Sequence, residues 1–299
     1  MENHLPSSEI SSLWGSGALT LLDGATGTEL DRRGVNINLP LWSARAIIEA
    51  PDVLGQIHKD YLYAGAEVVT ANTFRTHRRS LAQAGLGDRA GELTERAVAI
   101  ARQASDCVSE RALVAGSLAP LEDCYSPDLV PPDECLQEEH AEMAHHLVEA
   151  GADLLLVETM NTVREAVAAA SAAVATGLPT LVSIVCGRDD RLLSGESVAA
   201  AATALTSLRP NAILVNCASA LDLYRPLSEL RAHTSLPVGA YGNVGYTDDS
   251  QKWLNSDAAD PEAYARYAGQ WVEIGATLIG GCCGTSPAHI AALRANLLD

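Results

Sequence analysis

Eight short runs of apolar residues recur along the 299-residue chain, and each is followed by a segment that resembles an amphipathic helix. The runs are rich in Val, Leu and Ile and show no strict polar alternation, which is typical of parallel strands buried on both faces. Eight strand–helix units predict an α/β fold, namely a single-domain (β/α)8 TIM barrel. The predicted strands cover residues 19–24, 67–74, 112–120, 153–160, 179–186, 212–219, 237–243 and 276–284.

We expect a polar N-terminal tail over residues 1–17 and one barrel, without a linker, over residues 18–299. The alternative fold is a doubly wound open sheet, which predicts a G-x-G-x-x-G turn after an early strand. The GATGTEL segment after the first run lacks that spacing. The predicted helices cover residues 44–64, 88–105, 136–150, 162–175, 196–208, 220–233, 260–275 and 286–298.

The composition restricts the possible partners. A net charge of −18 argues against binding to nucleic acid or to an anionic membrane. No apolar stretch approaches the ~20 residues of a membrane span, and the N-terminus lacks the pattern of a secretory signal. Seven cysteines, two of them adjacent, favour a reducing cytoplasm over a disulfide framework. We therefore expect a cytoplasmic protein with small-molecule substrates, while the sequence predicts no oligomeric state.

Polar or reactive residues end nearly every predicted strand. The active sites of TIM barrels lie at the carboxyl ends of the strands. Turn chemistry explains any single one of these residues, but the whole set favours a polar, ligand-binding mouth. The strand-ending residues are Asp23, Asn72, Thr73, Ser117, Glu158, Cys186, Asn216, Cys217, Tyr241, Asn243, Cys282 and Cys283.

Three of these cysteines predict a metal site. Cys217 ends the sixth run and Cys282–Cys283 end the eighth. Alternate strands of a barrel contribute to the same interior layer, so the three side chains can point toward one place. Neighbouring residues on a regular strand face opposite sides, and one ion can bind both only if the strand becomes irregular. The nearby Gly280–Gly281 and Gly284 would allow such a backbone.

Three thiolates leave one open position on a tetrahedral zinc ion, as in catalytic zinc sites. An open position suits an incoming thiol, whose pKa the ion would lower. The residues alone leave two other interpretations open, namely two buried small hydrophobic residues or a vicinal redox pair. No other catalytic group is predicted, because none of the eight histidines ends a strand.

Five segments together resemble the homocysteine S-methyltransferase family, over about residues 19–298. The family has a (β/α)8 barrel and a zinc ion held by three cysteines that match Cys217, Cys282 and Cys283. The resemblance implies zinc as the cofactor and homocysteine as the methyl acceptor. The matching segments are DGATGTEL (23–30), ANTF (71–74), VETM (157–160), VNC (215–217) and IGGCCGT (279–285).

The resemblance also implies contacts to homocysteine. Glu158 and Asp23 are expected to bind its amino group, aided by the Gly24 backbone, since carboxylates are natural partners of an ammonium. Thr73 and Ser117 are expected near the amino-acid carboxylate or the backbone of the site. The alternatives are a turn-stabilising role for Asp23, helix capping for Glu158, and ordinary strand-end polarity for the two hydroxyl residues.

Asn216 is expected to orient the neighbouring Cys217 as an outer-shell partner of the metal, or only to satisfy backbone groups. The segment YGNVGY (241–246) departs from the family, which often has Tyr-Pro-Asn where Gly242 now replaces proline. We expect this segment to cover the donor pocket, with Tyr241 and Asn243 as candidates. Trp253 is a further candidate, either for a cation–π contact with the donor or as a packing residue.

The identity of the methyl donor is inferred from the branch of the family that the chain resembles. Because the predicted barrel extends to residue 299, we expect no folate- or cobalamin-binding module and no C-terminal extension of the betaine-dependent kind. It resembles the short branch that uses S-methylmethionine and also accepts S-adenosylmethionine, so we expect a sulfonium donor. Two alternatives stay open. One is methyl transfer from another donor, of the betaine type or methylcobalamin on a partner protein. The other is a non-catalytic zinc or redox-sensing protein that uses the vicinal thiols.

Overall fold

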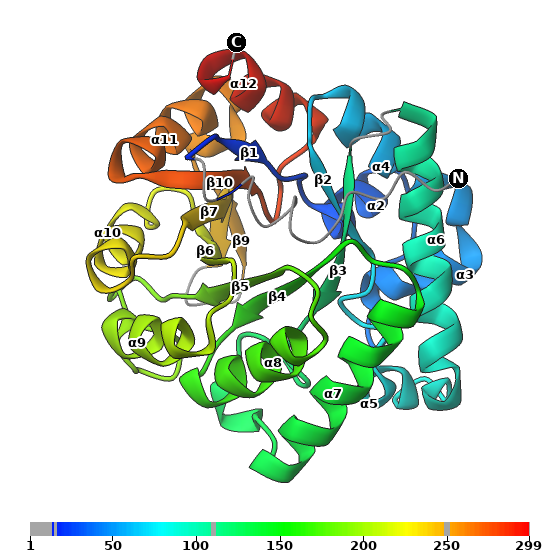
Figure 1. Cartoon of the computed structure of the whole chain (residues 1–299). Coiled ribbons are helices and arrows are strands. Elements are labelled where there is room, and N and C mark those ends of the chain that lie inside the picture. The colour runs from blue at the N-terminus through cyan, green and yellow to red at the C-terminus, as the bar shows by residue number, and fades with distance from the viewer. Residues whose placement is uncertain (1–13, 15–16, 109–111, 248–251, 299) are drawn as a thin grey trace.

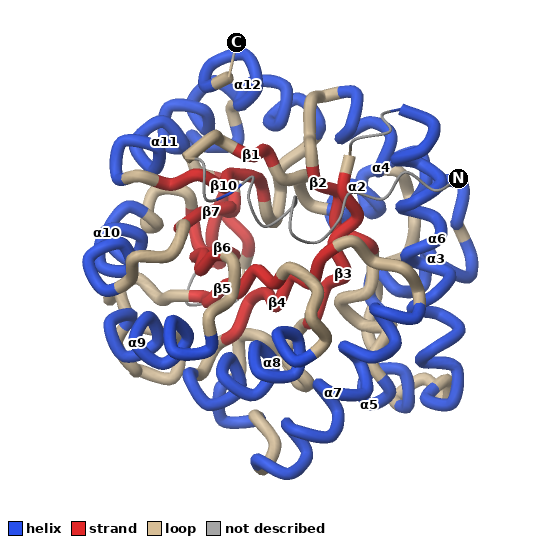
Figure 2. The backbone as a smooth tube through the Cα atoms, in the orientation of Figure 1, coloured by secondary structure: helices blue, strands red, loops and turns tan. Residues whose placement is uncertain are grey.

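The computed structural model describes residue 14 and residues 17–108, 112–247 and 252–298. Eight parallel strands form a central ring, and helices surround it (Figure 1, Figure 2). The single-domain (β/α)8 barrel predicted from the eight apolar runs is therefore confirmed. Each run contains one strand. The strands are β1 (Thr20–Leu21), β2 (Val68–Ala71), β3 (Leu113–Leu118), β4 (Leu154–Met160), β5 (Thr180–Val185), β6 (Ala212–Ser219), β7 (Val238–Asn243) and β10 (Ala276–Gly281).

The order of the strands in the ring is β1-β10-β7-β6-β5-β4-β3-β2. A parallel bridge between Leu22 and Val68 joins β1 to β2 and closes the barrel. The backbone N–H of Glu67 donates to the Leu21 carbonyl (2.7 Å) at the same place. Strand β7 pairs with both β6 and β10, so one strand separates the strand of Cys217 from that of Cys282–Cys283.

The helices form the outer layer of the barrel. The AGAEVV, AGADLL and IGATLI junctions each have a glycine with positive φ between a helix and the next strand, as predicted. The helices of the described chain are α2 (Thr26–Arg32), α3 (Arg45–Glu49), α4 (Pro51–Tyr63), α5 (Arg78–Ala82), α6 (Ala90–Val108), α7 (Asp133–Glu149), α8 (Val163–Ala175), α9 (Val198–Leu208), α10 (Tyr224–His233), α11 (Pro261–Ile274) and α12 (Pro287–Leu297). None of these helices is long and apolar enough to cross a membrane.

Two hydrophobic clusters stabilise the barrel. The larger one lies between the strands and the helices, and the smaller one joins alternate strand residues such as Leu154 and Leu156 inside the ring. Trp14 belongs to the inner cluster and is almost fully buried. The expected polar tail (1–17) otherwise lies outside the described residues, apart from Gly17. Trp14 is thus a core residue within that segment.

The structure contains elements that the sequence did not predict. Helix α2 follows β1 directly, and an antiparallel hairpin of β8 (Gly245–Thr247) and β9 (Trp253–Asn255) follows β7. The helix expected over 44–64 is interrupted at Ala50, which precedes Pro51 and has a non-helical backbone. A residue before proline is disfavoured in the helical region, which explains the interruption.

Candidate functional site

The side chains of Cys217, Cys282 and Cys283 meet at the carboxyl ends of β6 and β10. Their sulfur atoms all lie within 4.8 Å of one another, and Cys217 Sγ is 3.9 Å from Cys283 Sγ. Three thiolates on one tetrahedral zinc ion, with Zn–S bonds of ~2.3 Å, would be spaced at about 3.8 Å. The predicted convergence of the three cysteines is therefore present, and its spacing fits one metal ion.

Irregular backbone aims the three cysteines at one point. Cys217 has a φ of +57°, and the pairing of β6 with β7 shifts register between Asn216 and Ser219. Of the flanking glycines, Gly284 has a positive φ (+84°), which favours glycine. Gly280–Gly281 have a different role from the one expected, because a Cβ at Gly280 would lie 2.7 Å from the Cβ of Leu22. They permit close packing of β10 against its neighbours.

Asn243, at the end of β7, connects the two cysteine segments. Its side-chain amide donates to the Cys217 carbonyl (2.9 Å), and its side-chain oxygen accepts from the Cys283 backbone N–H (3.0 Å). The Cys282 backbone N–H donates to the carbonyl of Gly242 (2.8 Å). The middle strand thereby sets the separation of the cysteines on its two sides.

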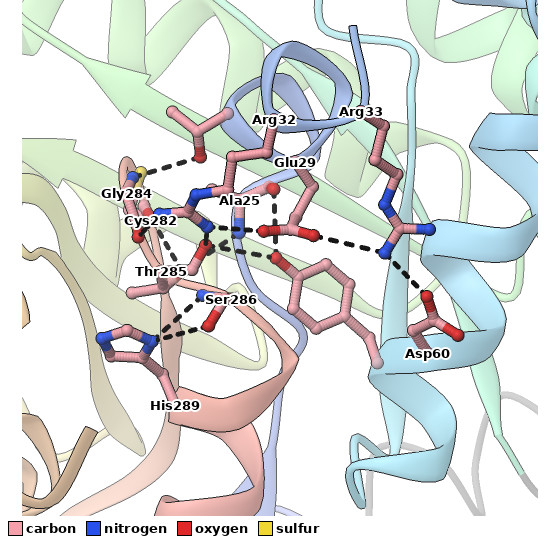
Figure 3. A network of polar contacts seen from close by, with 12 residues as sticks. Ala25, Glu29, Arg32, Arg33, Asp60, Cys282, Gly284, Thr285, Ser286 and His289 are labelled. Atoms are coloured by element: carbon pink, nitrogen blue, oxygen red, sulfur yellow. Dashed lines mark hydrogen bonds and ion pairs between the residues drawn. The ribbon is translucent and has the colours of Figure 1, made fainter. Parts of the chain in front are cut away.

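Helix α2 also supports the backbone turn that follows Cys283 (Figure 3). The Arg32 guanidinium donates to the carbonyls of Gly284 (2.5 Å) and Thr285 (3.0 Å). Glu29 accepts from Arg32 and from Arg33. Because α2 begins three residues after Asp23, the first strand–helix unit of the barrel positions the last one.

The thiols of the cluster differ in their acidity. Hydrogen bonds from the Cys217 and Cys282 thiols hold the pKa of Cys283 well below its usual value. Donation to Cys217 and Cys283, together with burial, raises the pKa of Cys282 well above its usual value. One thiolate therefore forms easily, while ionising the others needs a cation to offset the repulsion. The chemistry of this donor set fits a soft divalent metal ion.

A cavity of about 390 Å³ opens beside the sulfur atoms, within the range of ~300–1,000 Å³ that is typical of small-molecule sites. No histidine is among the described residues that line it. Five of its charged and aromatic side chains matter most for ligand binding, namely two buried carboxylates, an indole, a phenyl ring and a guanidinium. These side chains are Asp23, Glu158, Trp42, Phe74 and Arg75.

Glu158, on β4, is held by two hydrogen bonds. The Ser117 hydroxyl donates to Oε1 (2.5 Å) and the Tyr241 hydroxyl donates to Oε2 (3.3 Å). Burial raises the pKa of Glu158 to about 7. The hydrogen bonds fix the orientation of the carboxylate in the cavity, and its charge lacks the stabilisation that water would give.

Asp23 follows β1 and is buried at the same end of the barrel. Its carboxylate accepts from the backbone N–H (2.8 Å) and the hydroxyl (3.0 Å) of Thr70, so it also ties β1 to β2. Burial raises the pKa of Asp23 to about 7, and the nearby Glu158 charge adds to the effect. Gly24 is closely packed, since a Cβ there would lie 2.7 Å from the ring of Tyr61.

The expected site residues fall into three groups. Asp23, Gly24, Glu158, Tyr241 and the three cysteines line the cavity. A second group is buried beside the cavity, outside its lining, and makes internal hydrogen bonds. This group contains Thr73, Ser117, Asn216 and Asn243. Trp253 lies on β9, is 39% exposed and is likewise outside the lining.

The hydroxyl groups expected to face substrate are already engaged. The Thr73 hydroxyl donates to the Ser117 carbonyl (3.0 Å) and accepts from the Ser117 N–H (2.9 Å). The Asn216 side chain accepts from Ser183 (2.7 Å) and donates to Thr159 (2.8 Å). The side chains of Thr73 and Asn216 thus join neighbouring strands and lie outside the cavity lining.

The segment expected to cover the donor pocket begins within a strand. Tyr241–Asn243 belong to β7, and only Tyr241 of these lines the cavity. The N–H of Gly242 donates to the Tyr264 hydroxyl (2.9 Å), a bond that a proline could not form. The departure at Gly242 therefore affects the packing of β7 next to Cys282.

Several cavity residues were missed because they lie on irregular segments. Trp42 has a φ of +48° and packs on Gly27 of α2, while Phe74 and Arg75 follow the end of β2. Tyr125 lies in the loop between β3 and α7, and its hydroxyl is 2.9 Å from Cys217 Sγ. When Cys217 is a thiolate, only the phenol can donate in this contact. No periodic pattern marks such positions.

This fold and site define a TIM-barrel enzyme with a sulfur-rich centre that could hold a metal ion. The model of the homocysteine S-methyltransferase family matches residues 20–297. A homocysteine S-methyltransferase of Bacillus subtilis, YbgG, is 34% identical over 93% of this chain and 94% of its own length. The homocysteine S-methyltransferase of Escherichia coli K12 is 33% identical over 93% and 95%.

A crystal structure of the E. coli homocysteine methyltransferase MmuM in its metallated form superposes with a TM-score of 0.83. It is 31% identical in sequence and matches over 95% of this chain and 98% of its own. The chain belongs to the homocysteine S-methyltransferase family. It is a methyltransferase.

The position of Asn243 leads to a test of the metal centre. Replacing Asn243 with Ala removes both hydrogen bonds that join the cysteine segments, and we expect zinc affinity to fall by about 10–100-fold, as for other outer-shell partners. Competition with a chromophoric chelator measures this change. Asn296→Ala, an exposed site on α12, is the matched control. Equal affinity in the two variants would contradict the bridging role of Asn243.

Proposed function

We propose that the protein transfers a methyl group from a sulfonium donor, S-methylmethionine or S-adenosylmethionine, to the sulfur of L-homocysteine. The product is methionine, and zinc is the cofactor. The observation that carries the proposal is the cluster of three cysteine sulfurs beside two buried carboxylates in one cavity. The names of the bacterial relatives and the metallated state of the E. coli structure support it.

Cys217, Cys282 and Cys283 would hold the zinc ion. When bound, zinc supplies a positive charge that lowers the pKa of a substrate thiol and leaves a usable nucleophile at neutral pH. The chain's part is to hold three anionic sulfurs together, through Asn243 and through Arg32 behind the turn. The Tyr125 hydroxyl adds a hydrogen bond to Cys217 Sγ.

The carboxylates are placed to bind the ammonium group of homocysteine. Glu158 is oriented by Ser117 and Tyr241, and Asp23 is held by Thr70. In the cavity without substrate, burial disfavours their negative charge, so an incoming ammonium stabilises the ionised forms. The amino acid is thereby held with its side chain directed toward the sulfur cluster.

The donor would occupy the aromatic part of the cavity. Trp42 and Phe74 form an edge-to-face pair with ring centroids 5.7 Å apart, and aromatic faces attract sulfonium cations. In the transfer, a bond forms between the homocysteine sulfur and the methyl carbon while the donor's sulfur–methyl bond breaks. The donor leaves as a neutral thioether, and the proton of the homocysteine thiol goes to solvent. The net charge of −18 favours the approach of a cation.

Metal content and donor use test this proposal. We expect one zinc per chain and methionine formation when homocysteine is supplied with either sulfonium donor. Cys282→Ala should lose the metal and lower activity at least about a hundredfold, since a direct ligand matters more than outer-shell partners worth 10–100-fold. Cys107→Ala, at an exposed position, is the control.

Other results of the same assay would contradict the proposal. Product formed only with betaine, or only with methylcobalamin and a partner protein, would exclude the sulfonium donor. A metal-free protein with a vicinal disulfide after reducing purification would exclude the zinc site and favour a redox role.

The carboxylates predict a pH dependence. A carboxylate with a pKa raised to about 7 is ionised above that pH and protonated below it. Binding of the ammonium should therefore weaken as the pH falls through about 7, by up to about tenfold per pH unit. The ratio of kcat/KM for homocysteine to that for 4-mercaptobutyrate, which lacks the amino group, isolates this effect. Glu158→Gln should flatten the profile, and a pH-independent ratio in the unaltered protein would argue against the assignment.

A further inference from the structure

Arg75 is the only basic side chain among the described residues that line the cavity. It follows Phe74 just after β2, and it faces the same cavity as Asp23 and Glu158. The lining of this cavity therefore carries a guanidinium as well as two buried carboxylates. An amino acid has both charges, so this arrangement matches a zwitterion.

The Arg75 guanidinium has unused hydrogen-bonding capacity. Its Nε is completely buried and has no hydrogen-bond partner, and the described residues offer it no ion pair within 4 Å. A buried donor without a partner is unfavourable. By contrast, the nearby Arg79 is engaged by Glu122 and Glu139. The terminal nitrogens of Arg75 likewise have no hydrogen-bond or ion-pair partner among the described residues, and unlike Nε they are not fully buried, so they can donate to a ligand in the cavity.

The groups expected to hold a substrate carboxylate are engaged elsewhere. The hydroxyls of Thr73 and Ser117 make hydrogen bonds within the barrel wall and are outside the cavity lining. An amino acid bound through its ammonium at Glu158 still needs a partner for its carboxylate. Arginine meets a carboxylate through two parallel N–H donors, which suits this task.

We propose that Arg75 is a carboxylate-binding residue that receives the α-carboxylate of an amino-acid substrate. This inference rests on the proposed function, because it takes homocysteine and an amino-acid sulfonium as the ligands. Both carry an α-carboxylate, and Arg75 selects for that group in whichever substrate lies against it. Thiols or sulfonium compounds without a carboxylate are consequently poor substrates.

The test compares Arg75→Gln with the unaltered, zinc-loaded protein. Calorimetry measures the binding of homocysteine and of 3-aminopropane-1-thiol, the same molecule without its carboxylate. Steady-state kinetics at saturating homocysteine measures KM for S-methylmethionine and for its decarboxylated analogue. We expect Arg75→Gln to weaken binding of one carboxylate-bearing substrate by about tenfold or more, and to leave the decarboxylated analogues unchanged. Arg75→Lys should restore part of the loss.

The two measurements, homocysteine binding and the KM for S-methylmethionine, show which substrate's carboxylate Arg75 binds. A loss confined to homocysteine assigns Arg75 to the acceptor, and a loss confined to S-methylmethionine assigns it to the donor. Arg78→Gln, which removes a surface arginine paired with Glu142, is the matched control. Thermal unfolding of Arg75→Gln should match or exceed that of the unaltered protein, because an unpartnered buried donor is removed.

Two results would overturn the assignment. One is equal affinity of Arg75→Gln and the unaltered protein for both amino-acid substrates. The other is an equal loss for substrates with and without the carboxylate, together with lower thermal stability, which indicates a structural role. If the unaltered protein binds no homocysteine, the proposed function fails and the assignment of Arg75 fails with it.

Discussion

The mutual repulsion of three sulfur anions is the constraint on which the rest of this site depends. Thiolates within 4.8 Å of one another are unstable unless a cation lies between them and the backbone holds them in place. The backbone meets the second requirement from three directions. Cys217 takes a left-handed conformation at the end of β6, Asn243 on β7 bonds both cysteine segments, and Arg32 on α2 holds the turn after β10.

The same principle extends to the rest of the cavity. Burial raises the pKa of both Asp23 and Glu158 to about 7, so a nearby cation would stabilise their ionised forms as well. The sulfur cluster suits a metal ion, the carboxylates suit an ammonium, and the aromatic pair of Trp42 and Phe74 suits a sulfonium. The anionic and aromatic groups of the cavity thus suit cationic ligands, whereas Arg75 supplies the positive charge that the carboxylate of an amino acid requires.

The sequence predicted the barrel well because parallel strands buried on both faces leave a strong apolar signal. It also placed Cys217 and Cys282–Cys283 together, since the strand count alone puts them on alternate strands. It could not distinguish residues that face the cavity from residues that bond a neighbouring strand. Thr73, Ser117 and Asn243 end strands as Glu158 does, yet their partners depend on register and bulges. Tyr125 and Arg75 lie on irregular segments, where no periodicity reveals the direction of a side chain.

X-ray absorption at the zinc edge tests the central claim most directly, because it counts sulfur atoms around the metal. The zinc-loaded protein should have three sulfurs at ~2.3 Å and one lighter ligand. Addition of homocysteine should replace the lighter ligand with a fourth sulfur. Fewer than three sulfurs without substrate, or an unchanged number of sulfurs once homocysteine is bound, would contradict the account of Cys217, Cys282 and Cys283 as a thiol-activating centre.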